Sequence, residues 1–260
     1  MIKLLIIGFL FLSSNVCAFG TDGCDSSAVE VFHADGADAS TTFTDLDCDG
    51  NGVKALTAQG NAQVDTAQFK FWPSQDGRAG SALLDGTSDG VSAADSPDFD
   101  FTGGVWTVDC WARFNSLAAT GILFSQRSDD NNYHELRIGT NGSLNYYVVE
   151  GGGSTVTAES AASQVTTNTW YHLAVTENGD NYTIWKDGAV VLTVSDANRI
   201  INLTGNFYLG MSDVAAREMN GWIDECRVSK GKSRYPMNGV VYTVPTSPYC
   251  SGCEMNGIFD

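Results

Sequence analysis

The sequence has few prolines, few basic residues and little glutamate. Its 260 residues include 5 prolines, and 14 Lys and Arg stand against 31 Asp and Glu, which gives a net charge of −17. Nucleic acid is therefore excluded as a natural partner, because phosphate binding needs a cationic face, and anionic membrane surfaces are repelled in the same way. Only 8 of the 31 acids are Glu. Since glutamate favours helices and aspartate favours turns and binds calcium, the composition predicts strands and loops with a calcium ion as a candidate ligand.

Only one long apolar run is present, and it lies at the N-terminus. Lys3 precedes the run from Leu4 to Leu12, and small or neutral residues follow as far as Ala18. These nine apolar residues are fewer than the roughly 20 that span a bilayer, so the segment is interpreted as a signal peptide cleaved after Ala18. A lipoprotein signal through Cys17 is the alternative. The sequence thus predicts a secreted or cell-surface protein with no membrane insertion.

From about Val29 to Val244 the apolar residues repeat with a period of two, which is typical of half-buried strands. One run places alternate residues on one face, with Trp111 as the exception: Trp106, Val108, Cys110, Ala112 and Phe114. Asn141-Gly142 and Asp187-Gly188 each separate two such runs. Both predict hairpin turns, because a two-residue turn needs the positive φ that these residues adopt.

The repeated short strands and turn residues predict an all-β fold. Its form is a two-sheet antiparallel sandwich, a jelly roll, because no segment has the pattern of a three-turn helix. No linker rich in proline or charge divides the chain. The expected organisation is a signal peptide at 1–18, an N-terminal lead at 19–27, one domain at 28–249, and a C-terminal tail at 250–260 that contains a CxxC motif.

Several motifs follow one another in order along nearly all of residues 28–249. They are Phe32-His-Ala-Asp-Gly36, Ser40-Thr-Thr-Phe-Thr-Asp45, Gly60-Asn-Ala-Gln, Ala82-Leu-Leu-Asp-Gly86, Trp106 to Phe114, Thr169 to Val175, Ile184-Trp-Lys-Asp-Gly188, Gly221 to Lys230 and Arg234-Tyr235. Together they resemble a laminin-G-like domain, a concanavalin A-like lectin/glucanase sandwich. The resemblance implies a fold whose members serve as glycan binders, adhesion modules, virion appendages or, in some relatives, glycosidases.

The cysteines predict structural disulfides. Without Cys17 six remain, and an even number in an exported chain is typical of disulfide pairing. Cys110 and Cys226 each lie on the apolar face of a predicted strand, so they form either a core disulfide or two buried thiols. Cys24, Cys48, Cys250 and Cys253 are expected to pair among themselves, either as Cys24–Cys48 with Cys250–Cys253 or crosswise. A redox or zinc role for Cys250-Ser-Gly-Cys253 lacks a second ligand pair.

The sequence gives little support for catalysis. Glucanase relatives of this sandwich carry alternating acids on one strand, whereas here Asp224 and Glu225 are adjacent and should point to opposite faces. Gly86-Thr-Ser88-Asp-Gly90 matches a nucleophile-elbow string, but no helix pattern follows it, so a turn is predicted. A glycosidase would need acids from different strands to converge, with Asp129, Asp130 and Glu135 as the first residues to consider.

Two patterns of acids suggest calcium. Asp45, Asp47 and Asp49 form a DxDxDG string, although Leu56 stands where an EF-hand has its bidentate glutamate. The resemblance further implies that the first and last strands pair, which would bring Asp35 near Asp224, with Asp45 completing the set. An ordinary acidic loop, whose carboxylates accept hydrogen bonds from turn amides, is the alternative for both patterns.

Aromatic residues are candidates for stacking against sugars, because rings beside polar groups are typical of carbohydrate sites. Trp72, Tyr146, Tyr147 and Trp185 are the candidates, with packing as the alternative for each. The sequence as a whole predicts a secreted, non-catalytic binding module that recognises a glycan or another extracellular surface such as a surface protein. A structural subunit of a coat, filament or virion is the alternative, followed by a glycoside hydrolase; the oligomeric state stays open.

Overall fold

The computed structural model describes residues 24–71, 79–196, 199–214, 217–235 and 241–249. Within these ranges the chain forms sixteen strands, β1 to β16, and a single turn of 3-10 helix at Pro97–Phe99. The signal peptide, Trp72, Cys250 and Cys253 lie outside the described residues. The predicted all-β sandwich is therefore confirmed.

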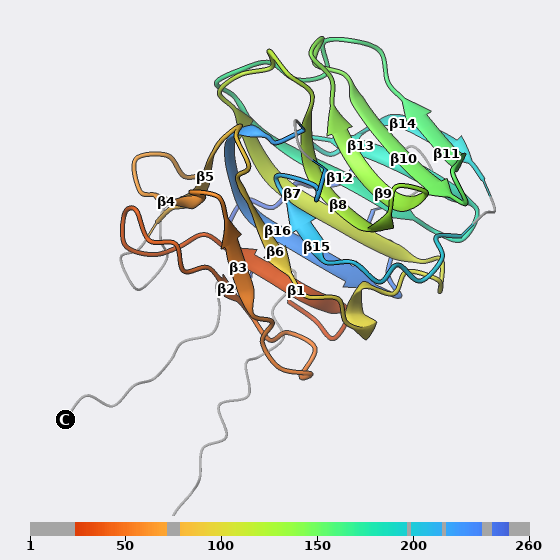
Figure 1. The fold of residues 1–260 in the computed structure, drawn as a ribbon, viewed down its shortest axis with the longest axis horizontal. Helices are drawn as coiled ribbons and strands as arrows, with labels where there is room; N and C mark the ends of the chain where they lie inside the picture. Colours follow the sequence, from red (N-terminus) through yellow and green to blue (C-terminus); the bar gives the residue numbers. More distant parts are fainter. Residues whose placement is uncertain (1–23, 72–78, 197–198, 215–216, 236–240, 250–260) are drawn as a thin grey trace, which may run out of the picture.

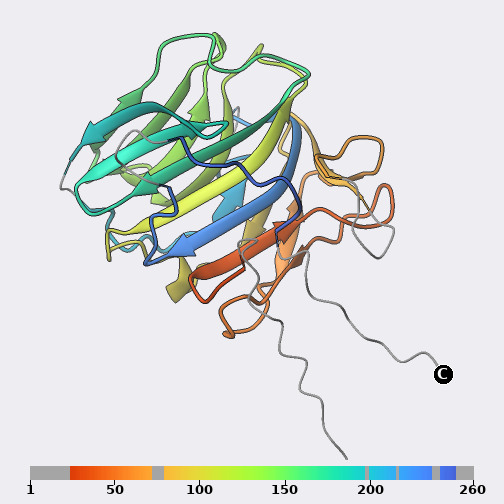
Figure 2. The same cartoon turned by 180° about the vertical axis from the view of Figure 1, so that it is seen from behind.

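The strands form two antiparallel sheets packed face to face, with the seven-stranded sheet in front in Figure 1 and the nine-stranded sheet in front in Figure 2. The nine-stranded sheet consists of β14 (Ala189–Ser195), β13 (Asn181–Lys186), β12 (Trp170–Glu177), β7 (Trp106–Phe114), β16 (Asn220–Lys230), β1 (Ala28–His33) and β2 (Thr44–Asp45), with β5 (Ser81–Asp85) on β16 and β4 (Gln63–Asp65) on β5. The seven-stranded sheet has the order β11 (Gly153–Glu159), β10 (Leu144–Glu150), β9 (Asn132–Ile138), β8 (Gly121–Asp129), β15 (Phe207–Leu209), β6 (Gly90–Ala93) and β3 (Leu56–Gln59).

The period-two pattern puts one side chain of every pair into the space between the sheets. Trp106, Val108 and Cys110 of β7 belong to this core, together with Phe124 and Tyr146 of the opposite sheet. Burial of the same apolar face along each strand supplies the main driving force for the sandwich. The two predicted hairpins are present, since β9 pairs with β10 and β13 with β14. At the second turn, Asp187 and Gly188 have φ values of 49° and 87°.

Trp111, which breaks the alternation in β7, lies on the outer face of the nine-stranded sheet and is still only 4% exposed. The Lys70 ammonium group lies 3.7 Å from its ring centroid, and the Phe71 ring packs edge-on against it. The same outer face carries Tyr235 and Tyr242, stacked against each other with ring centroids 3.6 Å apart. Segments that precede and follow β7 in the sequence therefore cover this face and bury the apolar residues on it.

Two disulfides fasten the nine-stranded sheet. Cys110 of β7 is joined to Cys226 of the neighbouring β16, so the alternative of two buried thiols does not occur. Cys24 is joined to Cys48, which decides against the crosswise pairing for these two residues. The first strand pairs with the last, as the family resemblance implied, with Phe32 opposite Cys226.

Glu30 provides a prediction about pH. Its side chain is 2% exposed, and its Oε2 atom has no hydrogen-bond partner among the described residues. Burial, with the nearby Asp45 carboxylate, raises the pKa of Glu30 from 4.5 to about 8. Because the unfolded chain loses this proton at lower pH than the folded chain does, stability contributed by neutral Glu30 is complete below pH 4.5 and is lost as the pH rises toward 8.

Replacing Glu30 by glutamine should therefore raise the melting temperature at alkaline pH, by roughly 5–10 °C, and leave it nearly unchanged near pH 4.5. Calorimetric melting of both proteins across this pH range measures the difference. A melting difference that is constant with pH would contradict the assignment of a raised pKa to Glu30.

Candidate functional site

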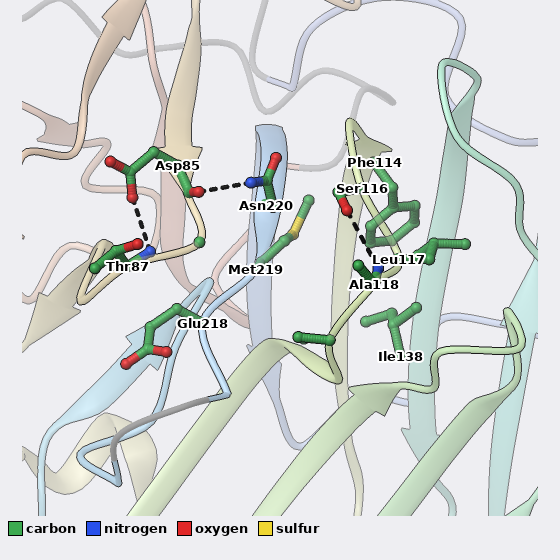
Figure 3. Close-up of a pocket in the computed structure, with 13 residues that line it drawn as sticks. Asp85, Thr87, Phe114, Ser116, Leu117, Ala118, Ile138, Glu218, Met219 and Asn220 are labelled. Carbon is green, nitrogen blue, oxygen red and sulfur yellow. Dashed lines mark hydrogen bonds between the residues drawn. The ribbon is translucent and has the colours of Figure 1, made fainter.

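A pocket of about 290 Å³ opens at one end of the sandwich (Figure 3). It forms where the turn after β5, the loop between β7 and β8, the end of β9 and the start of β16 meet. Thirteen residues line it: Asp85, Gly86, Thr87, Phe114, Ser116, Leu117, Ala118, Ala119, Gly121, Ile138, Glu218, Met219 and Asn220. The pocket thus combines segments of both sheets.

The pocket has an apolar side and a polar side. Leu117, Ala118 and Ile138 lie on one side of it in Figure 3, whereas the acidic side chains of Asp85 and Glu218 lie on the other. Small-molecule sites are typically concave and largely apolar, with a few polar groups that fix the orientation of the ligand. A sugar ring, which has an apolar face and polar edges, matches this division.

Short hydrogen bonds fix the polar side. The Thr87 amide donates to Asp85 Oδ1 at 2.7 Å, and Asn220 Nδ2 donates to the Asp85 carbonyl at 2.6 Å. Asn115 Nδ2 in turn donates to Asn220 Oδ1 at 2.8 Å. These contacts use one N–H of Asn220 Nδ2 and one acceptor position of Asn220 Oδ1. The second N–H and the second acceptor position can therefore hydrogen-bond a ligand without loss of these contacts.

Residues 86–89 of the Gly86 to Gly90 string form the turn between β5 and β6, as the sequence predicted, and Gly90 begins β6. Gly86 has a φ of 85°, and Ser88 has a φ of 61°. Asp89 closes the turn by accepting hydrogen bonds from the Asp85 amide at 2.9 Å and from the Asn61 amide at 2.8 Å. The turn therefore supplies one wall of the pocket from Asp85 to Thr87 and has no strand-to-helix geometry.

The acids of the DxDxDG string accept hydrogen bonds from backbone amides. Asp45 accepts from Val31 at 2.9 Å through Oδ1 and from Lys54 at 2.7 Å through Oδ2. Asp47 Oδ1 accepts from the Gly50 amide at 2.7 Å, and Asp49 Oδ1 from the Asn51 amide at 3.0 Å. These contacts hold the three carboxylates in local turns.

Asp35 and Asp224 lie close enough for their charges to interact. Burial raises the pKa of Asp224 well above its ordinary range, and Glu225 and Asp35 raise it further. Asp224 Oδ2 accepts a hydrogen bond from the Lys70 amide at 2.8 Å. Among the residues that the structure describes, no group of three or more His, Cys, Asp or Glu side chains is arranged to hold a metal ion. Calcium binding stays a prediction.

The expectation that Asp224 and Glu225 point to opposite faces is wrong. The pairing of β16 with β7 shifts register between Asp224 and Arg227, and Glu225 has a φ of 50°. This β-bulge inserts one extra residue, so the alternation of side chains is interrupted. Glu225 Oε1 lies 2.6 Å from His33 Nδ1, and its Oε2 accepts from the Tyr249 amide at 2.6 Å, so both acids lie on the outer side of the sheet.

The aromatic candidates have different environments. Tyr146 is fully buried in the core. Trp185 is fully buried against the stacked pair of Tyr235 and Tyr242, and its Nε1 donates to Thr176 Oγ1 at 2.9 Å. Tyr147 is half-buried on the outer face of the seven-stranded sheet, with the Arg137 guanidinium 4.4 Å from its ring centroid. Of these three rings, only that of Tyr147 has surface available to a ligand.

The acids considered for catalysis are also separated from the pocket. Asp129 and Asp130 lie around the turn between β8 and β9, where Asp129 accepts from the Asn131 amide at 2.7 Å and Asp130 pairs with Arg127. Glu135 lies within β9 and is 1% exposed. Sequence reasoning missed the residues that do line the pocket, such as Leu117 and Met219, because loop residues of this kind carry no distinctive spacing.

The family comparison agrees with this fold. A laminin-G family model (Laminin_G_3), described as the concanavalin A-like lectin/glucanases superfamily, matches residues 85–233, more than half of the chain. The chain therefore belongs to the concanavalin A-like lectin/glucanase superfamily. The matched segment contains every residue that lines the pocket.

Known proteins extend the comparison. A levanase of Bacillus subtilis is 26% identical over 215 residues, which are 74% of this chain but only 31% of the levanase, so the chain spans about a third of this relative. The binding domain of Paraclostridial Mosquitocidal Protein 1 aligns with a TM-score of 0.61 and 13% identity, covering 80% of this chain and 50% of the other. Domain 4 of an extracellular arabinanase from Geobacillus stearothermophilus, in complex with arabinotriose, has a TM-score of 0.51 and 17% identity, covering 74% and 84%.

Two observations bear on localisation. The two disulfides fit a secreted or surface protein, because such bonds persist in oxidising compartments. No helix within the described ranges is long and apolar enough to cross a membrane.

Proposed function

We propose that this chain is a secreted, non-catalytic module that binds a glycan. The observation that carries the proposal is the pocket of Figure 3, whose apolar side faces a polar side across a volume suited to a small ligand. Membership of the lectin/glucanase superfamily supports it. The arabinotriose complex of a similarly folded domain also supports an oligosaccharide as the class of ligand.

The pocket favours a neutral sugar. Leu117, Ala118 and Ile138 offer a surface for the apolar face of the ring, while Thr87 and Asn220 offer hydrogen-bonding groups to its hydroxyls. Asp85 and Glu218 lie at the same pocket, and the chain carries a net charge of −17. Acidic sugars are therefore disfavoured, because their carboxylates or sulfates would meet like charge.

Filling the pocket tests this proposal. Ala118 is exposed, so Ala118→Trp should occupy the pocket without disturbing the core, and Ala162→Trp makes the same change at an exposed site in another loop. A glycan array identifies the ligand, and calorimetry should show binding about tenfold or more weaker for Ala118→Trp but unchanged for Ala162→Trp. An array with no binding above background contradicts glycan binding, and equal affinity of Ala118→Trp and the unchanged protein removes the pocket from the proposal.

One observation favours a glycoside hydrolase as the second candidate. Asp85 and Glu218 come from different segments and line the same pocket, and glycoside hydrolysis uses two carboxylates. We expect no release of reducing sugar from polysaccharides that the protein binds. Turnover that is lost in both Asp85→Asn and Glu218→Gln would support the hydrolase instead.

Calcium is part of the sequence-based hypothesis, with Asp35, Asp45 and Asp224 as its ligands. A cation that binds only the folded chain stabilises it by mass action. The hypothesis expects a higher melting temperature in calcium than in chelator, and a loss of this difference in Asp35→Asn. Equal melting temperatures would remove calcium from the proposal.

A further inference from the structure

The seven-stranded sheet is in front in Figure 1. Its outer face carries a cluster of polar and aromatic side chains on β9 and β10. His134, Leu136 and Ile138 of β9 lie in or against the core, so the alternate residues of this strand point outward. Their neighbours on β10 are set by the pairing of Asn145 with Arg137 and of Tyr147 with Glu135. We name the Glu135 patch by its members: Tyr133, Glu135, Arg137, Asn145, Tyr147 and Arg217.

Two buried acceptor atoms in the Glu135 patch lack a hydrogen bond. Glu135 is 1% exposed, and its Oε1 accepts from Arg137 and, at 3.2 Å, from Arg217 Nη1, whereas its Oε2 has no partner in the described structure. Asn145 Nδ2 donates to Ser143 Oγ at 3.0 Å, but Asn145 Oδ1 is also buried without a partner. Buried acceptors without donors cost free energy, so folded proteins rarely retain them unless a water or ligand supplies the donor.

Donors and rings surround these acceptors. The Arg137 guanidinium lies over the Tyr147 ring, and its Nη2 donates to Tyr133 Oη at 3.4 Å. The Arg137 side chain is 20% exposed and that of Arg217 is 35% exposed, so both reach the surface. Each guanidinium has five N–H donors, more than Glu135 Oε1 can accept. The patch therefore offers donors at its surface beside acceptors beneath them.

This combination selects the class of ligand. An anion could accept hydrogen bonds from the guanidinium groups, but the Glu135 carboxylate would repel it. A cation could contact the acceptors, but the two arginines would repel it. A hydroxyl group can donate one hydrogen bond and accept another. It can therefore donate to Glu135 Oε2 or Asn145 Oδ1 and accept from a guanidinium. Neighbouring hydroxyls on a neutral sugar can satisfy both acceptors together.

We infer that the Glu135 patch is a second binding surface for a neutral polysaccharide, with Glu135 and Asn145 as the acceptors for its hydroxyls. The inference rests on the proposed function and extends it from one sugar unit to a chain. Arg217 contacts Glu135, and the next three residues, Glu218 to Asn220, line the pocket. Glu135 precedes the pocket residue Ile138 by three residues on β9, roughly 10 Å along a strand. The two side chains lie on opposite faces of β9, so the polysaccharide would pass over the end of this strand to reach both surfaces.

Paired variants test the inference. Glu135→Gln exchanges one acceptor atom for a donor, and Asn145→Leu removes an acceptor without leaving an arginine unpaired. Asn145→Asp keeps an acceptor in place and acts as the rescue variant. Glu150→Gln, at the end of β10, is the matched control for charge, since its Oε1 contacts the Ile201 amide at 3.1 Å outside the patch.

Calorimetry with a neutral oligosaccharide selected on the array should give affinities roughly tenfold or more weaker for Glu135→Gln and Asn145→Leu. Asn145→Asp and Glu150→Gln should bind like the unchanged protein. One set of results overturns the inference and leaves the proposed function standing. In it, the unchanged protein and Ala162→Trp bind the oligosaccharide, Ala118→Trp does not bind it, and both patch variants bind it normally. Preferential binding of an acidic polysaccharide overturns the class of ligand, and an absence of glycan binding by the unchanged protein overturns both.

Discussion

Replacing Asp109 by asparagine should destabilise the fold by about 3–5 kcal/mol. Asp109 lies on the outer face of β7 and is 1% exposed, and its Oδ2 accepts from Arg227 Nη2 at 2.6 Å and from Tyr249 Oη at 2.8 Å. Arg227 Nε donates to Oδ1 at 3.1 Å, so the pair is bidentate. Because Arg227 is itself only 4% exposed, loss of the carboxylate leaves a buried guanidinium without its counter-charge.

Unfolding in urea measures this loss, and a double variant separates its causes. Asp109→Leu with Arg227→Met removes both charges, and it should be less destabilising than Asp109→Asn because no unpaired charge stays buried. The pH dependence gives an independent check. Burial alone would raise the pKa of Asp109, but Arg227 and His172 outweigh it and hold the pKa well below 3.8. The stability contributed by ionised Asp109 is therefore present above pH 3.8 and is lost as the pH falls further.

The Asp109 network explains how the end of the chain is held against the nine-stranded sheet. Tyr249 donates to Asp109 of β7, and Tyr242 Oη lies 2.5 Å from Nδ1 of His172 in β12. These two contacts hold the segment from Tyr242 to Tyr249 against the sheet. Asp109→Asn should accordingly increase proteolysis near Tyr242 before it affects the seven-stranded sheet. A variant within 1 kcal/mol of the unchanged protein would show that the network contributes little net stability.

The second large effect is expected from the disulfide between β7 and β16. Removing Cys110–Cys226 with paired alanines should cost about 4–5 kcal/mol, because its sequence separation of 116 residues closes a long loop in the unfolded chain. The separation of 24 residues for Cys24–Cys48 predicts a smaller loss, about 3–4 kcal/mol, for the matching variant. Both pairs of alanines leave the charge unchanged.

Urea unfolding of the two variants, with the unchanged protein in oxidised and reduced form, measures these losses. The Cys110 and Cys226 side chains also lie in the core, so truncation adds a cavity cost to the loss of the bond. Reduction of the variant that lacks Cys24 and Cys48 breaks the Cys110–Cys226 bond without truncating a core side chain and so separates the two contributions. A larger loss for Cys24 and Cys48 than for Cys110 and Cys226 would contradict the dependence on loop length.

The strands illustrate what local patterning can predict. The alternation in 106–114 predicts β7, and the Asp187-Gly188 turn predicts the pairing of β13 with β14. Trp111 is the exception, because residues from distant segments cover it on the outer face of the sheet. No local sequence pattern contains this information. The bulge at Glu225 is a second exception, because its extra residue places Glu225 on the same face of the sheet as Asp224.

The proposed binding surfaces depend instead on residues that are far apart in the sequence. The pocket joins residues 85–87, residues between 114 and 121, Ile138 and residues 218–220. The Glu135 patch joins β9 and β10 to Arg217, which is 82 residues from Glu135. Tyr147 was a candidate from the sequence because aromatic residues commonly contact sugars, whereas Asn145 had no such signal. The Oδ1 atom of Asn145 is buried and has no hydrogen-bond partner within the described residues, which distinguishes Asn145 from the other described asparagines, and burial depends on the folded chain.

The sequence by itself determined the all-β class, the sandwich, the main hairpins and the family resemblance, because alternation and turn chemistry act between residues that are close in the chain. The tertiary structure alone decided the pairing of Cys24 with Cys48, the position of the pocket and the acceptors of the Glu135 patch. These depend on which distant segments meet when the two sheets pack and on which polar atoms then lose contact with water. Such distant contacts form only when the whole core is assembled.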